Sequence, residues 1–439
     1  MTSIAIVVLD TLRYDAFESN FDWLDGMRFK NTYSTSHWTI PAHASLYTGY
    51  YPSEVGIHGK QMNMNFDGDT LPEIFQEHGY STKLLTANPQ IHMWDGWTRG
   101  YDTAIGPSNL SVGNESLVDW DKFYAGCDSE GIRKYFEAVA HCFKSDSPAI
   151  PSLWQGIKET MLPADGGIKS ITQRVKETSF DGDDFIFINT MEAHTPYNPP
   201  KEYTDVDTPV DVVAGDAFSN SVTNPDELRD AYFASVEYLS DSYKELYENL
   251  SSDFDYVITT ADHGEMLGEH GMWNHSYGIY PELVHVPLVI SGDNIQECTI
   301  NDVVSLLDVH KTVCDLAEMP VDSRGQNLLE NIESRDYLFE YHGFLHWHRE
   351  QFKRKGVSES IFDEKDSPLD GFVTQDGTFA YETHDDSLVT PAGCQLPDAR
   401  SYLDNLLSEI DRKPGGYAES ASDGISNEMR KQLEDLGYA

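Results

Sequence analysis

Apolar runs and segments of helical periodicity alternate along most of this chain. The run Ser3–Leu9 is continuously apolar after its first residue and rich in β-branched side chains, which is typical of a strand buried on both faces of a parallel sheet. Similar runs predict strands at Thr82–Thr86, Asp184–Asn189, Asp255–Thr260 and Val286–Ile290. Because helical patterns lie between these runs, the sequence predicts an α/β sheet with helices on both faces.

Two of the intervening segments carry clear helix signals. Asn224 is a capping residue type, and it precedes Pro225, which suits the first helical position. Apolar residues then recur at spacings of three and four over Leu228–Leu250, so we expect a long amphipathic helix there. A second helix is predicted over Thr39–Thr48, since Pro41 would lie in its first turn.

The length of the chain indicates more than one structural unit. Its 439 residues predict one large α/β domain, over residues 1–333, plus a smaller appendage. Within the large domain, residues 106–174 are rich in Ser, Gly and Asp and show only weak helical patches. We therefore expect an insertion there that shapes the mouth of a pocket.

The pattern changes at about residue 334. Short strand-like segments follow at Tyr337–Tyr341, Gly371–Val373 and Phe379–Glu382, and an amphipathic helix is predicted near Ser426–Leu436. Residues 334–439 are therefore predicted to form a small C-terminal α+β subdomain built on an antiparallel sheet.

The charge balance separates this chain from most proteins of its size. Lys and Arg number 30 and Asp and Glu number 74, which gives a formal net charge of −44 spread along the whole chain. Such a surface repels itself at low salt and is screened at high salt, so we expect a halophile, such as a haloarchaeon, with a salt-filled cytoplasm. A nucleic-acid partner is not expected, because binding phosphates requires basic patches.

The cysteines and the hydropathy of the chain predict the cellular compartment in which the protein works. The five cysteines are scattered and form no CxxC motif, which fits free thiols in a reducing compartment. No apolar run approaches the roughly 20 residues that a membrane helix needs. Strand-like sequence begins at Ser3 and no signal peptide is recognised, so a cytoplasmic location is expected.

Two polar residues stand at the edges of predicted elements. Asp10 ends the first buried strand, where a carboxylate is costly unless it is paired or binds a metal. Thr39 starts a helix, where free backbone N–H groups and the helix dipole favour a bound oxyanion and a reactive hydroxyl. Each residue has an ordinary alternative as a helix cap, and each position alone leaves that alternative open.

Histidines and an acid gather later in the chain. Asp262 and His263 end a strand side by side, and His270 and His275 follow on a Gly-rich loop. Oxygen and nitrogen ligands of this kind suit a divalent ion. His194 follows another strand and precedes a proline-stiffened loop; a surface histidine is an equally good interpretation of it in isolation.

These segments, in this order, resemble the sulfatase-like branch of the alkaline phosphatase superfamily, which includes arylsulfatases, phosphonate monoesterases and phosphoglycerol transferases. The resemblance covers most of the chain. It runs through VVLDTLRYD, WTIPAHASLYTGYYP, HTPYNPP, TADHGEMLGEHGMW, VPLVISG and LLDVHKTV. It implies an alkaline-phosphatase-like sandwich, in which helices flank a large central mixed sheet and a small antiparallel C-terminal subdomain follows.

The resemblance also implies roles for individual residues. Thr39 stands where the family has its nucleophile, His43 where it has an arginine, and His275 where it has a lysine. His194 matches the histidine that contacts the substrate or the leaving group, and His194 or His275 would protonate the leaving alcohol. One divalent ion (calcium, manganese, magnesium or zinc) would be held by Asp10, Thr39, Asp262 and His263.

Three departures from the family pattern change the expected chemistry. Thr11 replaces the second acid after the first strand, which removes one metal ligand. Thr39 cannot be converted to the formylglycine aldehyde that many sulfatases make from Cys or Ser. His43 and His275 replace two permanent cations, so the anion pocket loses fixed positive charge.

The expected function is therefore metal-dependent hydrolysis of a sulfate or phosphate ester through a covalent Thr39 intermediate. A plain threonine is a good phosphoryl acceptor, whereas the family resemblance favours sulfate, so both ester classes remain open. The substrate would be a sulfated or phosphorylated small molecule or glycan. The alternatives are a phosphoglycerol or phosphoethanolamine head-group transferase and a catalytically decayed binding protein of the same fold.

Overall fold

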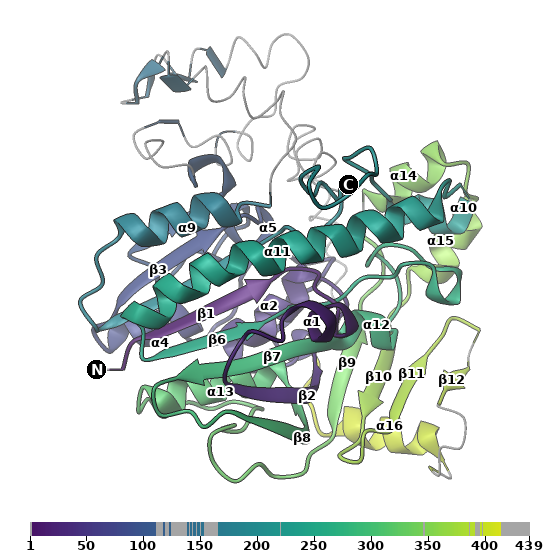
Figure 1. Ribbon diagram of the computed structural model, residues 1–439. Helices are drawn as coiled ribbons and strands as arrows, with labels where there is room; N and C mark the ends of the chain where they lie inside the picture. Colours follow the sequence, from purple (N-terminus) through teal and green to yellow (C-terminus); the bar gives the residue numbers. More distant parts are fainter. Residues whose placement is uncertain are drawn as a thin grey trace.

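The computed structural model describes residues 2–110 and 166–413, apart from 220, 346, 386, 391–395 and 397, together with scattered residues between 111 and 165 (Figure 1). Most of the predicted insertion at 106–174, and the predicted helix at Ser426–Leu436, lie outside the described residues. The described strands form a sheet of eight strands and a sheet of four.

The eight-stranded sheet is built around the first strand of the chain. Its strands, in sheet order, are β4 (Thr103–Ile105), β3 (Ser81–Thr86), β5 (Asp184–Thr190), β1 (Ile4–Leu9), β6 (Tyr256–Thr260), β7 (His285–Gly292), β2 (Met27–Tyr33) and β8 (Cys298–Ser305). β1 is completely buried and pairs in parallel with both β5 and β6. β7 runs antiparallel to β6 and β2, so the sheet is mixed, as the family resemblance implied.

The strands predicted from apolar runs are confirmed within one or two residues at each end. β2 and β8 were not predicted. Their sequences, MRFKNTY and CTINDVVS, mix charged and apolar residues, and the first five residues of β8 are at least partly exposed. Strands near a sheet edge carry polar residues of this kind, and their hydrophobic runs are correspondingly short.

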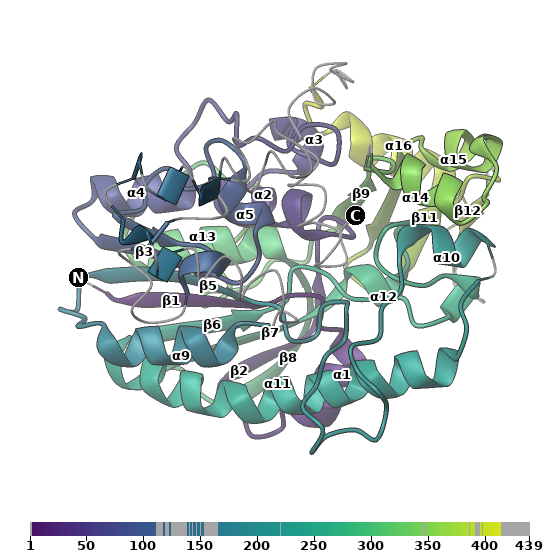
Figure 2. The ribbon, with the colours of Figure 1, turned by 90° about the horizontal axis from the view of Figure 1, so that it is seen from above.

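Helices cover both faces of the central sheet (Figure 2). One face carries α1 (Tyr14–Asn20), α9 (Ile168–Glu177) and α11 (Pro225–Asp253), and the other carries α2 (Thr39–Thr48), α4 (Leu71–Glu77), α5 (Gln90–Met93) and α13 (Leu306–Leu316). The long helix α11 confirms the predicted periodicity, since the apolar residues that recur at spacings of three and four from Leu228 to Leu250 are buried. Asn224 precedes α11 in a left-handed conformation, but its side chain bonds Glu227 and does not cap the helix.

The four-stranded sheet is antiparallel throughout and lies beside the central sheet, which confirms the predicted antiparallel C-terminal region. It contains β9 (Tyr337–Tyr341), β10 (Leu369–Val373), β11 (Phe379–Glu382) and β12 (Leu388–Val389). The predicted boundary between residues 333 and 334 stays a prediction. The remaining short helices are α3 (Pro52–Val55), η1 (Pro107–Asn109), α10 (Ala214–Ser219), η2 (Glu269–Gly271), α12 (Pro281–Val284), α14 (His348–Arg354), α15 (Glu359–Lys365) and α16 (Ala399–Ser408).

The two sheets are joined beside the start of α2. The backbone N–H of Glu340 in β9 donates to the carbonyl oxygen of Thr35 at 2.9 Å, and the Ser36 hydroxyl donates to the Glu340 carbonyl oxygen at 2.6 Å. The segment that leads into α2 is therefore held against β9 by two hydrogen bonds. Among the described helices, none is long and apolar enough to cross a membrane.

Candidate active site

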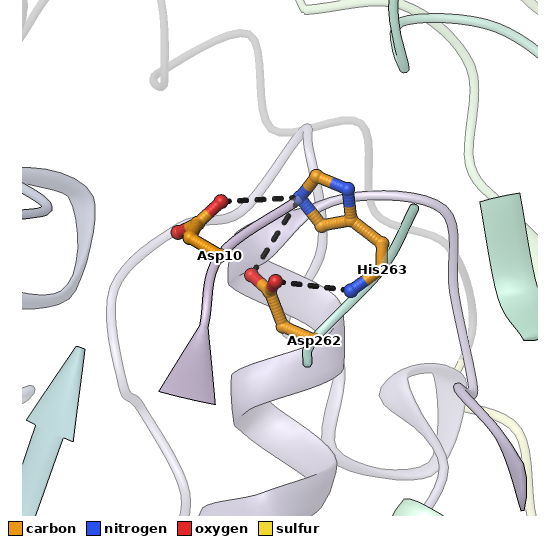
Figure 3. Close-up of side chains that lie close together, drawn as sticks. All are labelled: Asp10, Asp262 and His263. Atoms are coloured by element: carbon orange, nitrogen blue, oxygen red, sulfur yellow. Dashed lines mark hydrogen bonds and ion pairs between the residues drawn. The ribbon is translucent and has the colours of Figure 1, made fainter. Parts of the chain in front are cut away.

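The ends of two neighbouring parallel strands bring three ligand-type side chains together (Figure 3). Asp10 directly follows β1, and Asp262 and His263 follow β6. The His263 Nε2 atom lies 3.7 Å from Asp10 Oδ1 and 3.5 Å from Asp262 Oδ2, and one ligand atom of each residue lies within 4.8 Å of the others. All three side chains are fully buried. The carboxyl edge of the sheet is thus the site that strand–helix alternation predicts.

Thr39 joins this cluster from the start of α2. It is the first residue of the helix, and Trp38, not Thr39, occupies the cap position. Its Oγ1 lies 3.5 Å from His263 Nε2. Asp10 is no helix cap either, because the next helix begins at Tyr14. The ordinary explanations of both residues therefore fail, and the four predicted metal ligands lie at one place.

The donor set fits a divalent cation. The His263 Nδ1–H donates to the carbonyl oxygen of Gly264 at 2.9 Å, so Nε2 carries the lone pair and faces the two carboxylates. Asp262 Oδ2 is buried and accepts no hydrogen bond from the described residues. Two carboxylate oxygens and one imidazole nitrogen at this spacing suit calcium, manganese, magnesium or zinc.

The two carboxylates have opposite electrostatic environments. Burial raises the pKa of Asp262, and the nearby charge of Asp10 raises it further. Burial acts on Asp10 in the same direction, but the electrostatic interactions with the imidazoles of His194 and His263 and the hydrogen bond from Asn88 outweigh it, so the pKa of Asp10 is lowered. In the described part of the chain, neither carboxylate pairs with Lys or Arg. A bound divalent cation would remove this imbalance.

Two asparagines that the sequence analysis missed support the cluster. Asn88 Nδ2 donates to Asp10 Oδ2 at 2.7 Å and to Thr39 Oγ1 at 3.4 Å. Asn189 Nδ2 donates to Asp10 Oδ2 at 3.2 Å. Asn88 follows β3 and Asn189 lies near the end of β5, so the strand-end rule that selected Asp10 also applies to them.

His43 lies one turn into α2, behind Thr39. Its Nδ1–H donates to the Thr39 carbonyl oxygen at 2.9 Å, and its Nε2 accepts from Asn189 Nδ2 at 3.4 Å. Burial lowers the pKa of His43 despite the nearby acids. Both ring nitrogens therefore face protein atoms and the imidazole is neutral, so contact with the transferred group stays a prediction.

His194 and His275 lie on the other side of His263. The His275 ring centroid is 4.5 Å from that of His263 and 4.9 Å from that of His194. The His194 Nδ1–H donates to the Thr195 carbonyl oxygen. Burial and the neighbouring His275 lower the pKa of His194 to about 4, and burial holds the pKa of His275 well below its ordinary value. The predicted leaving-group histidines thus lie at the cluster.

Two further residues contact His275, and a third holds one of them; none of the three was predicted. Glu265 Oε1 lies 3.2 Å from His275 Nδ1, and Tyr197 OH donates to Glu265 Oε2 at 2.9 Å. Burial raises the pKa of Glu265 to about 7. His37 Nδ1–H donates to the His275 carbonyl oxygen at 2.7 Å. Glu265 belongs to the same segment as Asp262 and His263, so proximity in sequence was an available signal.

Two other residues of the motif segments have different surroundings. His270 stacks on Tyr280 at the surface, with 45% of its side chain exposed, so it does not join the cluster with His275. Thr11 donates from its hydroxyl to Asp10 Oδ1 at 2.8 Å and from its backbone to Asp262 Oδ1 at 3.3 Å. The residue that replaces the family's second acid is thus a hydrogen-bond donor to both carboxylates.

Comparisons with known proteins identify the family of the chain. The sulfatase family model matches residues 17–319 of the chain. The uncharacterized sulfatase YidJ of Escherichia coli K12 is 22% identical over 386 residues, which is 78% of this chain and 75% of the relative. The choline-sulfatase of Rhizobium meliloti is 24% identical over 329 residues, or 67% of this chain and 61% of the relative.

Solved structures share the fold. The phosphonate monoester hydrolase of Agrobacterium radiobacter aligns with a TM-score of 0.61 at 15% identity, over 93% of this chain and 95% of that protein. The mixed sheet, the family match and the shared fold define an ester hydrolase of the alkaline phosphatase superfamily. Within it, the chain belongs to the sulfatase family, because the family model matches well over half of its length.

Proposed function

We propose that this protein hydrolyses a sulfate or phosphate-type ester through a covalent ester on Thr39, with one divalent metal ion. The position of Thr39 Oγ1, 3.5 Å from the lone-pair nitrogen of His263 at a helix start, carries the proposal. Asp10 and Asp262 would be the other metal ligands. A bound divalent cation would lower the pKa of the threonine hydroxyl and supply an alkoxide near neutral pH.

The chain's own residues then orient the attack. Asn88 donates toward Thr39 Oγ1 and holds that oxygen in place. His43 fixes the carbonyl of the same residue from behind. The start of α2 carries the positive end of the helix dipole, which would stabilise the charge that accumulates on the oxygens of the anion during transfer. These contacts support a nucleophile that is positioned before the substrate arrives.

His194 is our candidate for the proton donor to the leaving oxygen. It is neutral before substrate binds, because its pKa is about 4. The charge of the bound anion raises the pKa of His194, so that Nε2 takes up a proton from solvent when the substrate binds and donates it to the leaving oxygen when the ester bond breaks. Water then cleaves the Thr39 ester and restores the hydroxyl.

The substrate class rests on relatives with different names. A choline-sulfatase and a structure named as a 2-O GAG sulfatase are among the similar proteins, so we propose a sulfated small molecule or glycan as one class. The phosphonate monoester hydrolase has the same fold, and an unmodified Thr39 suits phosphoryl transfer, which supports a phosphodiester as the other.

An activity panel distinguishes the two classes. The purified protein is assayed with p-nitrophenyl sulfate, p-nitrophenyl phosphate and bis-p-nitrophenyl phosphate, each with calcium, manganese, magnesium or zinc. We expect metal-dependent turnover that Thr39→Ala lowers by at least about 1,000-fold without changing the melting temperature. Thr48→Ala, at the far end of the same helix, is the matched control. Full activity in Thr39→Ala would exclude the covalent mechanism.

The acidic composition of the chain decides the salt concentration of the assay buffer. We infer a halophilic protein from the net charge of −44, so the panel is run in molar KCl and repeated at low salt. The acidic surplus predicts higher thermal stability in the high-salt buffer. An equal melting temperature in both buffers would contradict the halophilic interpretation.

A further inference from the structure

The second half of the proposed reaction needs a group that the first half does not use. A formylglycine sulfatase can release its ester through the second oxygen on the same carbon, but Thr39 has a single hydroxyl. The Thr39 ester is therefore broken by a water molecule that attacks sulfur or phosphorus. Water is a weak nucleophile near neutral pH, so a nearby base that accepts its proton speeds this step.

The residue at the place of the family's lysine has the geometry of such a base. Glu265 Oε1 lies 3.2 Å from His275 Nδ1, and both side chains are almost completely buried. When Glu265 is ionised it accepts hydrogen bonds, so His275 Nδ1 then carries the proton and Nε2 carries the lone pair. Tyr197 OH donates to Glu265 Oε2 at 2.9 Å and fixes the carboxylate from its other side.

The backbone of His275 is held as firmly as its ring. Its carbonyl oxygen accepts from His37 Nδ1–H at 2.7 Å, and His37 lies two residues before Thr39. The ring stands 4.5 Å from that of His263, whose Nε2 approaches Thr39 Oγ1. These contacts connect the proposed base to the proposed nucleophile through two independent routes.

A cavity reaches His275. It is lined by His37, Trp38, His275, Ser276, Gly343, Leu345 and His348, and its volume is about 10 Å³. One water molecule needs about this much room, and polar side chains in the lining offer it hydrogen bonds. The cavity lies between the start of α2 and the C-terminal region, so it supplies a place for water next to the proposed base.

We propose that His275 is the general base that hydrolyses the Thr39 ester, and that Glu265 is the residue that positions it. This inference rests on the proposed function. One water proton passes to His275 Nε2 while the water oxygen bonds to sulfur or phosphorus. The bond from that atom to Thr39 Oγ breaks, the proton returns from His275 to Oγ, and the acid product leaves.

Trapping the intermediate tests this assignment. Wild-type protein, His275→Gln and Glu265→Gln are mixed with the p-nitrophenyl ester that the wild type turns over best. Burst kinetics and intact-protein mass are then measured. We expect both variants to release about one p-nitrophenol per molecule quickly and then turn over at least about 100-fold more slowly than wild type. Their mass should rise by one transferred group, located on Thr39 by peptide mapping.

Matched controls distinguish the loss of the Glu265–His275 contact from a nonspecific disturbance of the fold. His270→Gln lies on the same loop but at the surface, with 45% of the side chain exposed, and should behave as wild type. Tyr197→Phe keeps the Glu265–His275 contact and should show a smaller accumulation of the same ester. It also serves as the measurable variant if Glu265→Gln fails to fold.

The possible failures differ. If the burst and the steady rate fall together in His275→Gln with no ester on Thr39, His275 acts in the first step and the assignment is wrong. If the ester accumulates equally in wild type and both variants, neither residue assists hydrolysis. If Thr39→Ala is fully active, the proposed function itself fails and this inference with it.

Discussion

Two buried carboxylate clusters in this protein solve the same electrostatic problem differently. One is the reaction centre, with Asp10 and Asp262. The other is the Glu340 cluster, which we define as Glu340, Ser53, His342 and Arg412. Glu340 accepts from the Ser53 backbone N–H at 2.9 Å, from its hydroxyl at 2.5 Å and from Arg412 Nη2 at 3.1 Å.

The pKa values record the difference. Burial raises the pKa of Glu340, but His342, Arg412 and Ser53 outweigh it and lower the pKa to about 2. At the reaction centre the pKa of Asp262 is raised, and no Lys or Arg among the described residues pairs with either acid. The Glu340 cluster is complete within the chain, whereas the reaction centre needs a cation from outside.

The largest expected effect comes from Asp262→Asn. We expect activity to fall by at least about 1,000-fold, because the substitution removes a proposed metal ligand. In metal-free protein the same change should raise the free energy of unfolding by about 1 kcal/mol, since it removes repulsion from Asp10. Chemical denaturation with a chelator measures this. A clear loss of metal-free stability would contradict the comparison.

Glu340→Gln should have the opposite signature. The substitution removes the charge that His342, Arg412 and Ser53 stabilise, although Arg412 keeps Asp370 as its other partner, so we expect a loss of about 3 kcal/mol in unfolding free energy. Activity per folded molecule should stay near that of wild type, because Glu340 does not contact the reaction centre. Denaturation and an active-site-normalised assay measure the two effects, and a selective loss of activity would show that the clusters are coupled.

The same cluster predicts that the free energy of unfolding falls at acidic pH. The folded pKa of Glu340, about 2, lies below its ordinary value of 4.5. Its contribution is therefore fully present above pH 4.5 and is lost as the pH falls toward 2, and it amounts to about 3 kcal/mol. In Glu340→Gln, the free energy of unfolding, measured over a series of pH values, should fall less between pH 4.5 and pH 2. If the dependence of the unfolding free energy on pH is unchanged in Glu340→Gln, Glu340 is not the cause of the stability loss at low pH.

Metal addition should affect only the reaction centre. A cation that binds the folded state alone, present at 100 times its dissociation constant, adds about 2.7 kcal/mol. Calorimetry with and without chelator should therefore show a higher melting temperature for metal-loaded wild type and little change for Asp262→Asn. The carboxylate variant Asp315→Asn, whose partner is Lys311 on α13, should respond as wild type does. A metal-independent wild type would contradict the site.

The smallest expected effect is that of Asn88→Ala. Asn88 contacts Asp10 and Thr39 without being a proposed ligand, so its removal should slow turnover by about 10-fold and leave metal binding largely intact. Steady-state kinetics with a metal titration measure both. Loss of the metal would instead assign Asn88 a direct part in holding it.

The sequence predicts best what depends on local pattern. β1 and α11 are predicted from apolar runs and spacing, and α2 is predicted from the proline in its first turn. Asp10 and Asp262 are found because strand ends meet at one sheet edge. β2 and β8 escape prediction because their burial comes from neighbours in space. Their residues alternate too weakly to show it.

The site is predicted unevenly for the same reason. Asp10, Thr39, Asp262 and His263 belong to recognisable motifs, whereas Asn88 and Asn189 are of a residue type common in any loop. Tyr197 approaches Glu265 only through the loop after β5, and no local pattern announces that contact. Long-range pairing of isolated polar residues leaves no periodic trace in a sequence.

The central place of β1 also has a consequence for biosynthesis. β1 is made first, yet its partners are β5 and β6, the second of which ends at Thr260. A ribosome needs roughly 10 to 50 s to add the intervening residues at ordinary elongation rates. During that time β1, which is apolar, has not yet paired with both β5 and β6. Chaperone binding to the nascent chain is expected in this interval, and nascent chains that stop before β6 lack half of the metal ligands.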